Sequence, residues 1–288
     1  MSVLRLTGFL GRLAAVLVCL AAPAANAAYV CNVSVTNVSV AFVPTVTATN
    51  VMTGSYTINC TRLAGDPNVL NWSLANDNGG AGAGGNNFAN LGASTYQYDT
   101  YFPGSLTNKW GSGAALRFTG AMNFGASLNA SASGSFDVVV VGTQTVGPTG
   151  TYTDTVGLRL RNTSTGATIG ANPIASFVVS IVTSNYCQIS VSPGNLNFTY
   201  TSFQVGAAAA STTYGVRCTL IPYTMSLDAT SGTMLGLNYS LSLSTVSTTG
   251  TGVTQTHTIN GSIAGGQSGT CATGSCSASQ TRTLTITY

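Results

Sequence analysis

The sequence predicts an all-β protein built from two β-sandwiches in tandem. Three observations predict this class: the composition, an internal repeat with a cysteine near the start of each half, and apolar–polar alternation in the closing strands. Thr, Val, Ser and Tyr are abundant in the 288 residues, Glu is absent, and only 5% of the residues are charged. This composition suits antiparallel sheets and argues against helical bundles and coiled coils.

The N-terminal residues 1–27 are predicted to be a bacterial secretory signal. Arg5 and Arg12 supply the positive start, and the apolar run from Leu13 to Ala22 is too short to span a bilayer. Ala25-Asn-Ala has the small-x-small pattern of a cleavage site. A transmembrane anchor is the alternative. We expect cleavage and export.

Six cysteines follow the predicted signal, and an even number after an export signal implies disulfides in an oxidising compartment. Two pairs enclose loops of similar length and the third closes a tight turn, which favours one of the 15 possible pairings. The alternative, a zinc site, lacks histidine partners and suitable spacing. The expected disulfides are Cys31–Cys60, Cys187–Cys218 and Cys271–Cys276.

The two halves repeat each other from their first cysteines. Cys31-Asn-Val-Ser-Val opens the first half and Cys187-Gln-Ile-Ser-Val opens the second. In each half a second cysteine ends a strand-like segment, Tyr56-Thr-Ile-Asn-Cys and Tyr214-Gly-Val-Arg-Cys. The repeat therefore predicts two copies of one domain.

The repeat continues to the end of each half. Asn71–Leu74 corresponds to Tyr223–Leu227, and both lead into turns rich in Gly, Asn and Thr. Each half closes on an alternating segment, Tyr152–Leu160 in the first and Gln280–Tyr288 in the second. This alternation predicts strands with one buried face.

These residues resemble the spore coat protein U domain family, whose domains also form the subunits of archaic (Csu-type) chaperone–usher pili. The resemblance implies immunoglobulin-like, pilin-type sandwiches. It is weaker in the first half, which we regard as the more diverged. It rests on Ile221-Pro-Tyr-Thr-Met-Ser-Leu-Asp, Leu237-Asn-Tyr, the terminal Thr-Leu-Thr-Ile-Thr-Tyr288, Tyr96-Gln-Tyr with Trp110-Gly, and Gly150-Thr-Tyr-Thr-Asp-Thr-Val.

In this family each pilin domain lacks its last strand, and a chaperone and then the next subunit fill the gap. Only Ala28-Tyr-Val precedes Cys31 after the expected cleavage, too little to donate a strand, so the resemblance implies a two-domain tip subunit. We expect domains at residues 28–183 and 184–288. Because the second domain ends at Tyr288 on its alternating strand, we expect it to be incomplete and to await a donor strand.

A donor-like strand lies inside the chain, at residues 174–183. It alternates Phe177, Val179 and Ile181 with Val178, Ser180 and Val182, just before the second repeat begins. We hypothesise that it completes the first domain within the same molecule. The alternative is that it simply begins the second domain.

Adhesion is expected to involve apolar side chains on loops at the free end of the first domain, against hydrophobic or abiotic surfaces. The three candidate loops are Val43–Met52, Phe118–Phe124 and Val141–Pro148, which mix apolar residues with Gly, Thr or Pro. The candidate residues are Val43, Val46, Met52, Phe118, Met122, Phe124 and Val146.

No catalytic set, metal site or cofactor motif is recognised, and we expect a non-enzyme. The single histidine, His257, is expected to face solvent on a strand. A net charge of +3 gives no basic face for nucleic acid.

The expected function is a pilus tip adhesin for surface attachment and biofilm formation, located at the cell surface of a Gram-negative bacterium. The expected partners are a periplasmic chaperone, an outer-membrane usher and the adjacent pilin. The alternative is a secreted coat or matrix protein of the same fold.

Overall fold

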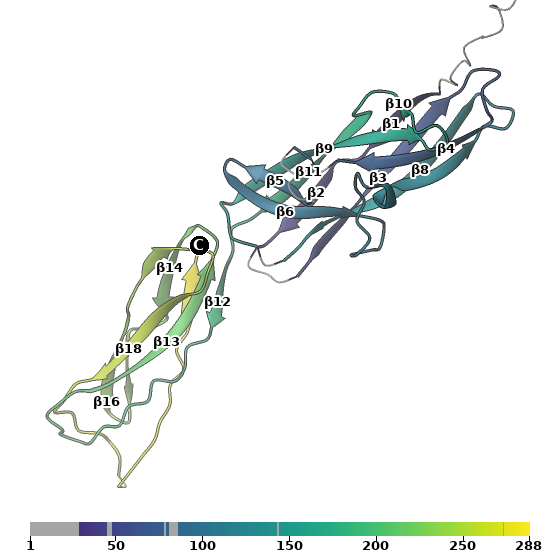
Figure 1. Ribbon diagram of the computed structural model, residues 1–288. Helices are drawn as coiled ribbons and strands as arrows, with labels where there is room; N and C mark the ends of the chain where they lie inside the picture. The colour runs from purple at the N-terminus through teal and green to yellow at the C-terminus, as the bar shows by residue number, and fades with distance from the viewer. Residues whose placement is uncertain (1–28, 45–47, 78, 81–85, 143, 273) are drawn as a thin grey trace, which may run out of the picture.

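The computed structural model describes residues 29–288 except 45–47, 78, 81–85, 143 and 273 (Figure 1). The predicted signal at residues 1–27 therefore lies outside the described residues. The described chain forms two β-sheet units that follow one another, joined by the short segment between β11 and β12 (Figure 1). No helix among these residues has the length and apolarity needed to cross a membrane.

The first unit contains strands β1 to β11 and one short 3₁₀ helix, η1. Strands β1-β3-β8-β6 form one layer, and β7-β4-β9-β11-β2 form the other, with β10 added to β9. The β5–β6 hairpin connects the layers, because β5 pairs with β6 and also, at Asn90, with β9. The elements are β1 Val30–Val35, β2 Val38–Phe42, β3 Asn50–Thr61, β4 Val69–Asn76, β5 Asn87–Leu91, β6 Ser94–Tyr101, η1 Ala114–Leu116, β7 Phe118–Asn123, β8 Asn129–Val140, β9 Gly150–Asn162, β10 Thr168–Ile169 and β11 Ala175–Thr183.

The core of the first unit is one continuous cluster between these layers. It forms because alternate residues of each strand point inward, as a pleated strand requires. Aromatic rings dominate it: Trp110 packs against Phe118, Phe136 and Phe177 with ring centroids 4.9–6.3 Å apart. The aromatic residues of the 96–110 segment, including Tyr96 and Tyr98, are therefore mostly core residues.

The second unit contains two smaller sheets, one of five strands in the order β12-β13-β18-β16-β15 and one of three in the order β17-β14-β19. Leu235 and Gly236 both have positive φ in the β15–β16 hairpin, as a two-residue type I′ turn requires. The strands are β12 Cys187–Val191, β13 Ala208–Cys218, β14 Pro222–Leu227, β15 Ser231–Met234, β16 Leu237–Leu243, β17 Ser247–Thr249, β18 Gln255–Ile263 and β19 Leu284–Thr287.

The core of the second unit is smaller and split. One cluster is built around Tyr214, Tyr223 and Met225, and another around Tyr239 and Leu241. These clusters contain seven and three buried residues, against 27 in the first unit. Many apolar residues between them are only partly buried. The second unit thus covers its apolar interior less completely than the first.

Disulfides join Cys31 to Cys60, Cys187 to Cys218 and Cys271 to Cys276. In each unit the first bond connects directly opposite residues on its first paired strands, β1 with β3 and β12 with β13. The two units therefore begin in the same way, as the repeat indicates.

Candidate strand-acceptor site

Strand β11 occupies the gap between two other strands of the first unit. It pairs antiparallel with β9 along its whole length, from Ala175 opposite Leu158 to Thr183 opposite Gly150. On its other edge it pairs parallel with β2, from Val179 opposite Val38 onward. Residues 174–183 therefore form backbone ladders with the first unit.

The inward side chains of β11 are part of the first core. Phe177, Val179 and Ile181 are each at most 1% exposed. The only strand that pairs with β2 among the described residues is β11. Strand β11 thus supplies residues of the core and is also the strand with which β2 pairs.

The second unit has counterparts of the strands that flank β11. The closing strands β9 and β19 correspond in the repeat, and so do β4 and β14. Accordingly β4 pairs with β9, with Leu74 opposite Leu160, and β14 pairs with β19, with Leu227 opposite Leu284. On the other edge of β19, where β11 would lie, the described chain provides no strand.

The counterpart of β2 is the segment 194–200. Leu196, Phe198 and Tyr200 alternate there with polar residues, as Val38 and Val40 do in β2. Residues 194–200 nevertheless form no strand, and these three side chains are only half-buried, whereas those of β2 are buried. Because β2 receives its ladder from β11, the missing neighbour explains both differences.

We call the outer edge of β19 and the segment 194–200 the acceptor edge. Leu284 and Ile286 contribute partly buried apolar side chains from β19, and Leu196, Phe198 and Tyr200 contribute them from the segment. An unpaired strand edge beside exposed apolar surface is able to take up another extended chain.

Residues around the acceptor edge anchor it to the rest of the second unit. Arg282, just before β19, donates from Nη2 to the carbonyl oxygen of Ser231 at 3.0 Å, and its guanidinium lies over the ring of Tyr239. Tyr200 accepts a hydrogen bond at its hydroxyl from the backbone N–H of Gln267 at 2.8 Å. Both walls are thereby positioned before any strand is added.

His257 is buried, which corrects the expectation that it faces solvent. It lies on β18 opposite Tyr214 of β13, and its Nε2 is 2.9 Å from the hydroxyl oxygen of Tyr223. Burial lowers the pKa of His257. The strand alternation that places His257 inside is shared with Ile259 and Ile263. That signal was present in the sequence and was missed.

Two of the three candidate adhesive loops lie at the junction end of the first unit, which is also a correction. Thr183, where the chain leaves for the second unit, pairs with both Phe42 and Gly150. The loops after Phe42 and before Gly150 therefore lie at this end and not at the free end. Met52 is exposed, and Val43 and Val146 are half-buried.

The third candidate loop is largely a strand. Residues 118–123 form β7, which pairs with β4; Met122 and Phe124 are buried, and Phe118 packs against the core. These side chains cannot meet a surface without leaving the core. Val46 lies outside the described residues.

The acceptor-edge residues were not singled out from the sequence. The signal that could have identified them is the alternation of Leu196, Phe198 and Tyr200, and of Leu284 and Ile286, with polar residues. The chain also shows no cluster of three or more metal-ligating side chains within its described part.

The sequence profile of the Spore Coat Protein U domain matches residues 16–159 and 174–242, more than half of the chain. The chain belongs to the Spore Coat Protein U domain family. The second matched range begins at Ile174, so the Spore Coat Protein U profile includes β11 in the second copy, whereas the structure pairs β11 within the first unit.

Solved structures similar to this Spore Coat Protein U protein were also found. One is described as the CsuC–CsuE chaperone–tip adhesion subunit pre-assembly complex from archaic chaperone–usher Csu pili of Acinetobacter baumannii, with 14% identity, coverage of 90% of this chain and 100% of that chain, and a TM-score of 0.44. Another is the CupB6 tip adhesin from Pseudomonas aeruginosa, with 10% identity, 91% and 96% coverage, and a TM-score of 0.35. Comparison with curated proteins finds no match. Because these identities and TM-scores are low, the family assignment rests on the profile alone.

Proposed function

We propose that this protein is the two-domain tip adhesin of an archaic chaperone–usher pilus. Residues 28–183 form the adhesive domain, and residues 184–288 form the domain that anchors it to the fibre. The observation that carries the proposal is the difference at one position of the repeat: the first unit has β11 on the edge of β9 away from β4, whereas the described residues of the second unit provide no strand on the edge of β19 away from β14.

The missing strand is supplied by other proteins in turn. A periplasmic chaperone occupies the acceptor edge during export, the outer-membrane usher receives the complex, and the adjacent pilin then replaces the chaperone. An added strand satisfies the backbone of β19 and covers the half-exposed apolar side chains. About four inward side chains contribute roughly 1.5–3 kcal/mol each before ordering costs are subtracted.

The use of β11 within the first unit supports a position at the end of the fibre. Its backbone is paired on both edges, with β9 and β2, so it is not free to enter a neighbour. The chain then accepts one strand and gives none from the residues described. Such a subunit terminates a polymer, and in a cell-surface pilus the terminal subunit is the one that contacts a surface and supports biofilm formation.

The adhesive face is proposed at the end of the first unit opposite the junction. Three exposed apolar side chains gather there: Val30 of β1 lies opposite Thr61, the last residue of β3; Leu63 follows Thr61 by two residues; and Leu128 accepts at its carbonyl oxygen from the backbone N–H of Arg62 at 2.9 Å. Apolar side chains at such an end bind a hydrophobic surface by excluding water. Many pili together make weak contacts effective.

Binding of a donor peptide tests the proposal. The probe is a synthetic peptide with the sequence of β11, Ala175–Thr183, which already fits the equivalent position in the first unit. We expect it to bind the oxidised full chain and to protect the second unit from protease. Ile286→Asp places a charge on the inner face of the acceptor edge and should abolish protection, whereas Thr285→Asp on the exposed face of the same strand should not.

A second unit that resists protease without any peptide or chaperone would contradict the proposal. The chain would then be a self-sufficient secreted coat or matrix protein of the same family.

A further inference from the structure

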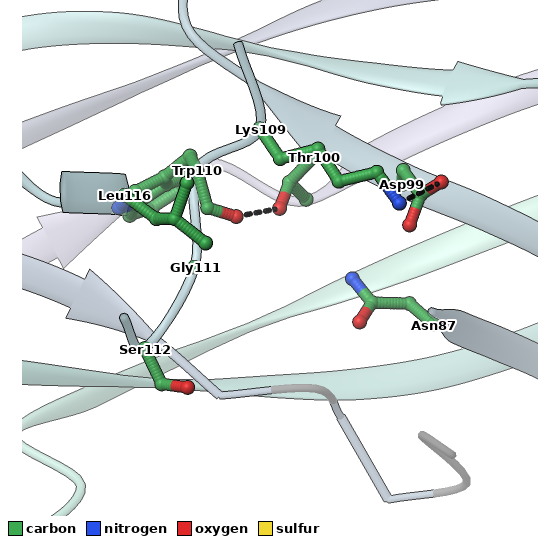
Figure 2. A pocket seen from close by; sticks show the side chains of 8 residues that line it. All are labelled: Asn87, Asp99, Thr100, Lys109, Trp110, Gly111, Ser112 and Leu116. Carbon is green, nitrogen blue, oxygen red and sulfur yellow. Dashed lines mark hydrogen bonds and ion pairs between the residues drawn. The ribbon is translucent and has the colours of Figure 1, made fainter. Parts of the chain in front are cut away.

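A small polar pocket lies on the flank of the first unit. It is bounded by the start of β5, the end of β6 and the loop that leads to η1, and its volume is about 110 Å³. This is several times the space that one water molecule needs. Figure 2 shows the Asn87 amide pointing into the space between Asp99, Gly111 and Ser112.

One asparagine side chain that lines this pocket has unused hydrogen-bonding capacity. Asn87 is 4% exposed, and its amide has no hydrogen-bond partner among the residues the structure describes. Asn76 lies behind the pocket wall: its Nδ2 donates to Thr100 Oγ1, a lining residue, at 2.7 Å, and its Oδ1 is closed off from solvent. Buried polar groups in folded proteins normally have partners, so the Asn87 amide, which faces the pocket, points to a bound molecule.

The charges at the pocket select a neutral molecule. Asp99 is buried, and its Oδ2 lies 2.9 Å from Lys109 Nζ, which also donates to Asn86 Oδ1 at 3.3 Å. The ion pair is neutral as a whole, so an added anion would meet Asp99 and an added cation would meet Lys109. A hydroxyl group both donates and accepts, and it therefore suits an amide and a carboxylate side by side.

We propose that this pocket binds a hydroxyl-rich ring of a neutral carbohydrate, through the Asn87 amide and the Asp99 carboxylate. A wider hollow of about 680 Å³ shares Lys109 and Leu116 with it and includes Phe102. That hollow gives the next sugar of a chain an apolar wall. The site goes beyond the proposed function, because it is independent of both the acceptor edge and the apolar free end.

Fluorine NMR on the full chain labelled with 5-fluorotryptophan tests the proposal. The protein has two tryptophans, Trp72 and Trp110, and only Trp110 lines the pocket. Assignment follows from a Trp72→Phe variant. Glucose, galactose, mannose and glycerol are titrated at tens of millimolar, with sodium sulfate and calcium chloride as charged probes. We expect a saturable shift of the Trp110 signal with at least one sugar and no comparable shift of the Trp72 signal.

Three variants make the test specific. Gly111→Ala puts a methyl group at ordinary contact distance, 3.6 Å from Leu116 Cδ1, and should abolish the sugar response without disturbing the fold. Asn87→Ala should weaken binding about fivefold or more. Asn32→Ala, on the exposed face of β1, is the matched control and should bind like the parent chain.

No saturable response to any sugar, a response to sulfate or calcium alone, or a sugar response unchanged in Gly111→Ala would each overturn the proposal. None of these outcomes bears on donor-peptide binding, so the two proposals fail separately.

Discussion

A buried carboxylate, Asp154, and a half-buried one, Asp77, fix the backbone of this nearly uncharged chain at defined points. Asp154 accepts hydrogen bonds from the Tyr98 hydroxyl and from the backbone N–H of Gly80, both at 2.8 Å. Burial and the Asp154 carboxylate together raise the pKa of Tyr98. Asp77 accepts from the backbone N–H of Gly157 at 2.9 Å. The sequence places Asp77 beside a glycine-rich run, but the partners of these two carboxylates, 56 to 80 residues away, follow only from the sheet order.

Acid should destabilise the second unit through His257. Its pKa is lowered by burial, so the folded unit holds it neutral while the unfolded chain takes up a proton near its ordinary pKa of about 6.5. The unfolded state then binds more protons, and the free energy of unfolding should fall as the pH drops below about 6.5. The facing Tyr214 and Tyr223 stay neutral in this range.

Denaturant unfolding of the second unit between pH 7.5 and 5 measures this effect. His257→Gln keeps a polar group beside Tyr223 but cannot titrate, so its stability should depend less on pH. An equal pH slope in the two proteins would exclude His257 as the cause.

Strand β11 should be essential for the stability of the first unit. Phe177→Ala removes a buried ring that packs on Trp110 and Phe136, and we expect it to lower the free energy of unfolding by about 3–5 kcal/mol. Ser176→Ala, on the exposed face of the same strand, should change it little. Chemical denaturation, followed by fluorescence of Trp72 and Trp110, measures both. A loss below about 1 kcal/mol for Phe177→Ala would mean that β11 is dispensable.

Alternation predicted the closing strands and residues 174–183, since one buried face leaves a clear period of two. The same alternation at Leu196, Phe198 and Tyr200 would predict a strand, yet none forms there. The reason is that a strand needs a neighbour to pair with, and the described residues of the second unit supply no such neighbour. The expectation for residues 118–124 is wrong in the opposite sense, because a loop is expected there and a strand forms. Their glycine and polar residues suggest a loop, but pairing with β4 makes β7 a strand.

The whole molecule has an apolar free end that should control attachment. Leu63→Asp combined with Leu128→Asp places charges on two exposed side chains, so the fold should persist while adhesion to polystyrene falls several-fold. Met52→Asp, exposed at the junction end, is the control. Attachment assays on piliated cells with equal pilus numbers compare the three. A loss confined to Met52→Asp would instead assign adhesion to the junction loops.

We infer that the molecule combines two domains of one repeat, one complete and one open to a donor strand. The repeat itself, the disulfides and the strand-rich class could be predicted from the sequence because they depend on local spacing. That β11 completes the first domain was a hypothesis with the second domain as the alternative, because the long-range pairing that decides between them is not contained in the strand's own residues.

Hydrogen exchange on the oxidised, full-length chain tests this claim most directly. Without a partner, amides of β9 and β2 should be strongly protected, whereas those of residues 194–200 and the outer edge of β19 should exchange quickly. Addition of the cognate chaperone or the donor peptide should protect the second set. If residues 194–200 and β19 are already as protected as β2 and β9 in the isolated chain, the second domain is complete and the account is wrong.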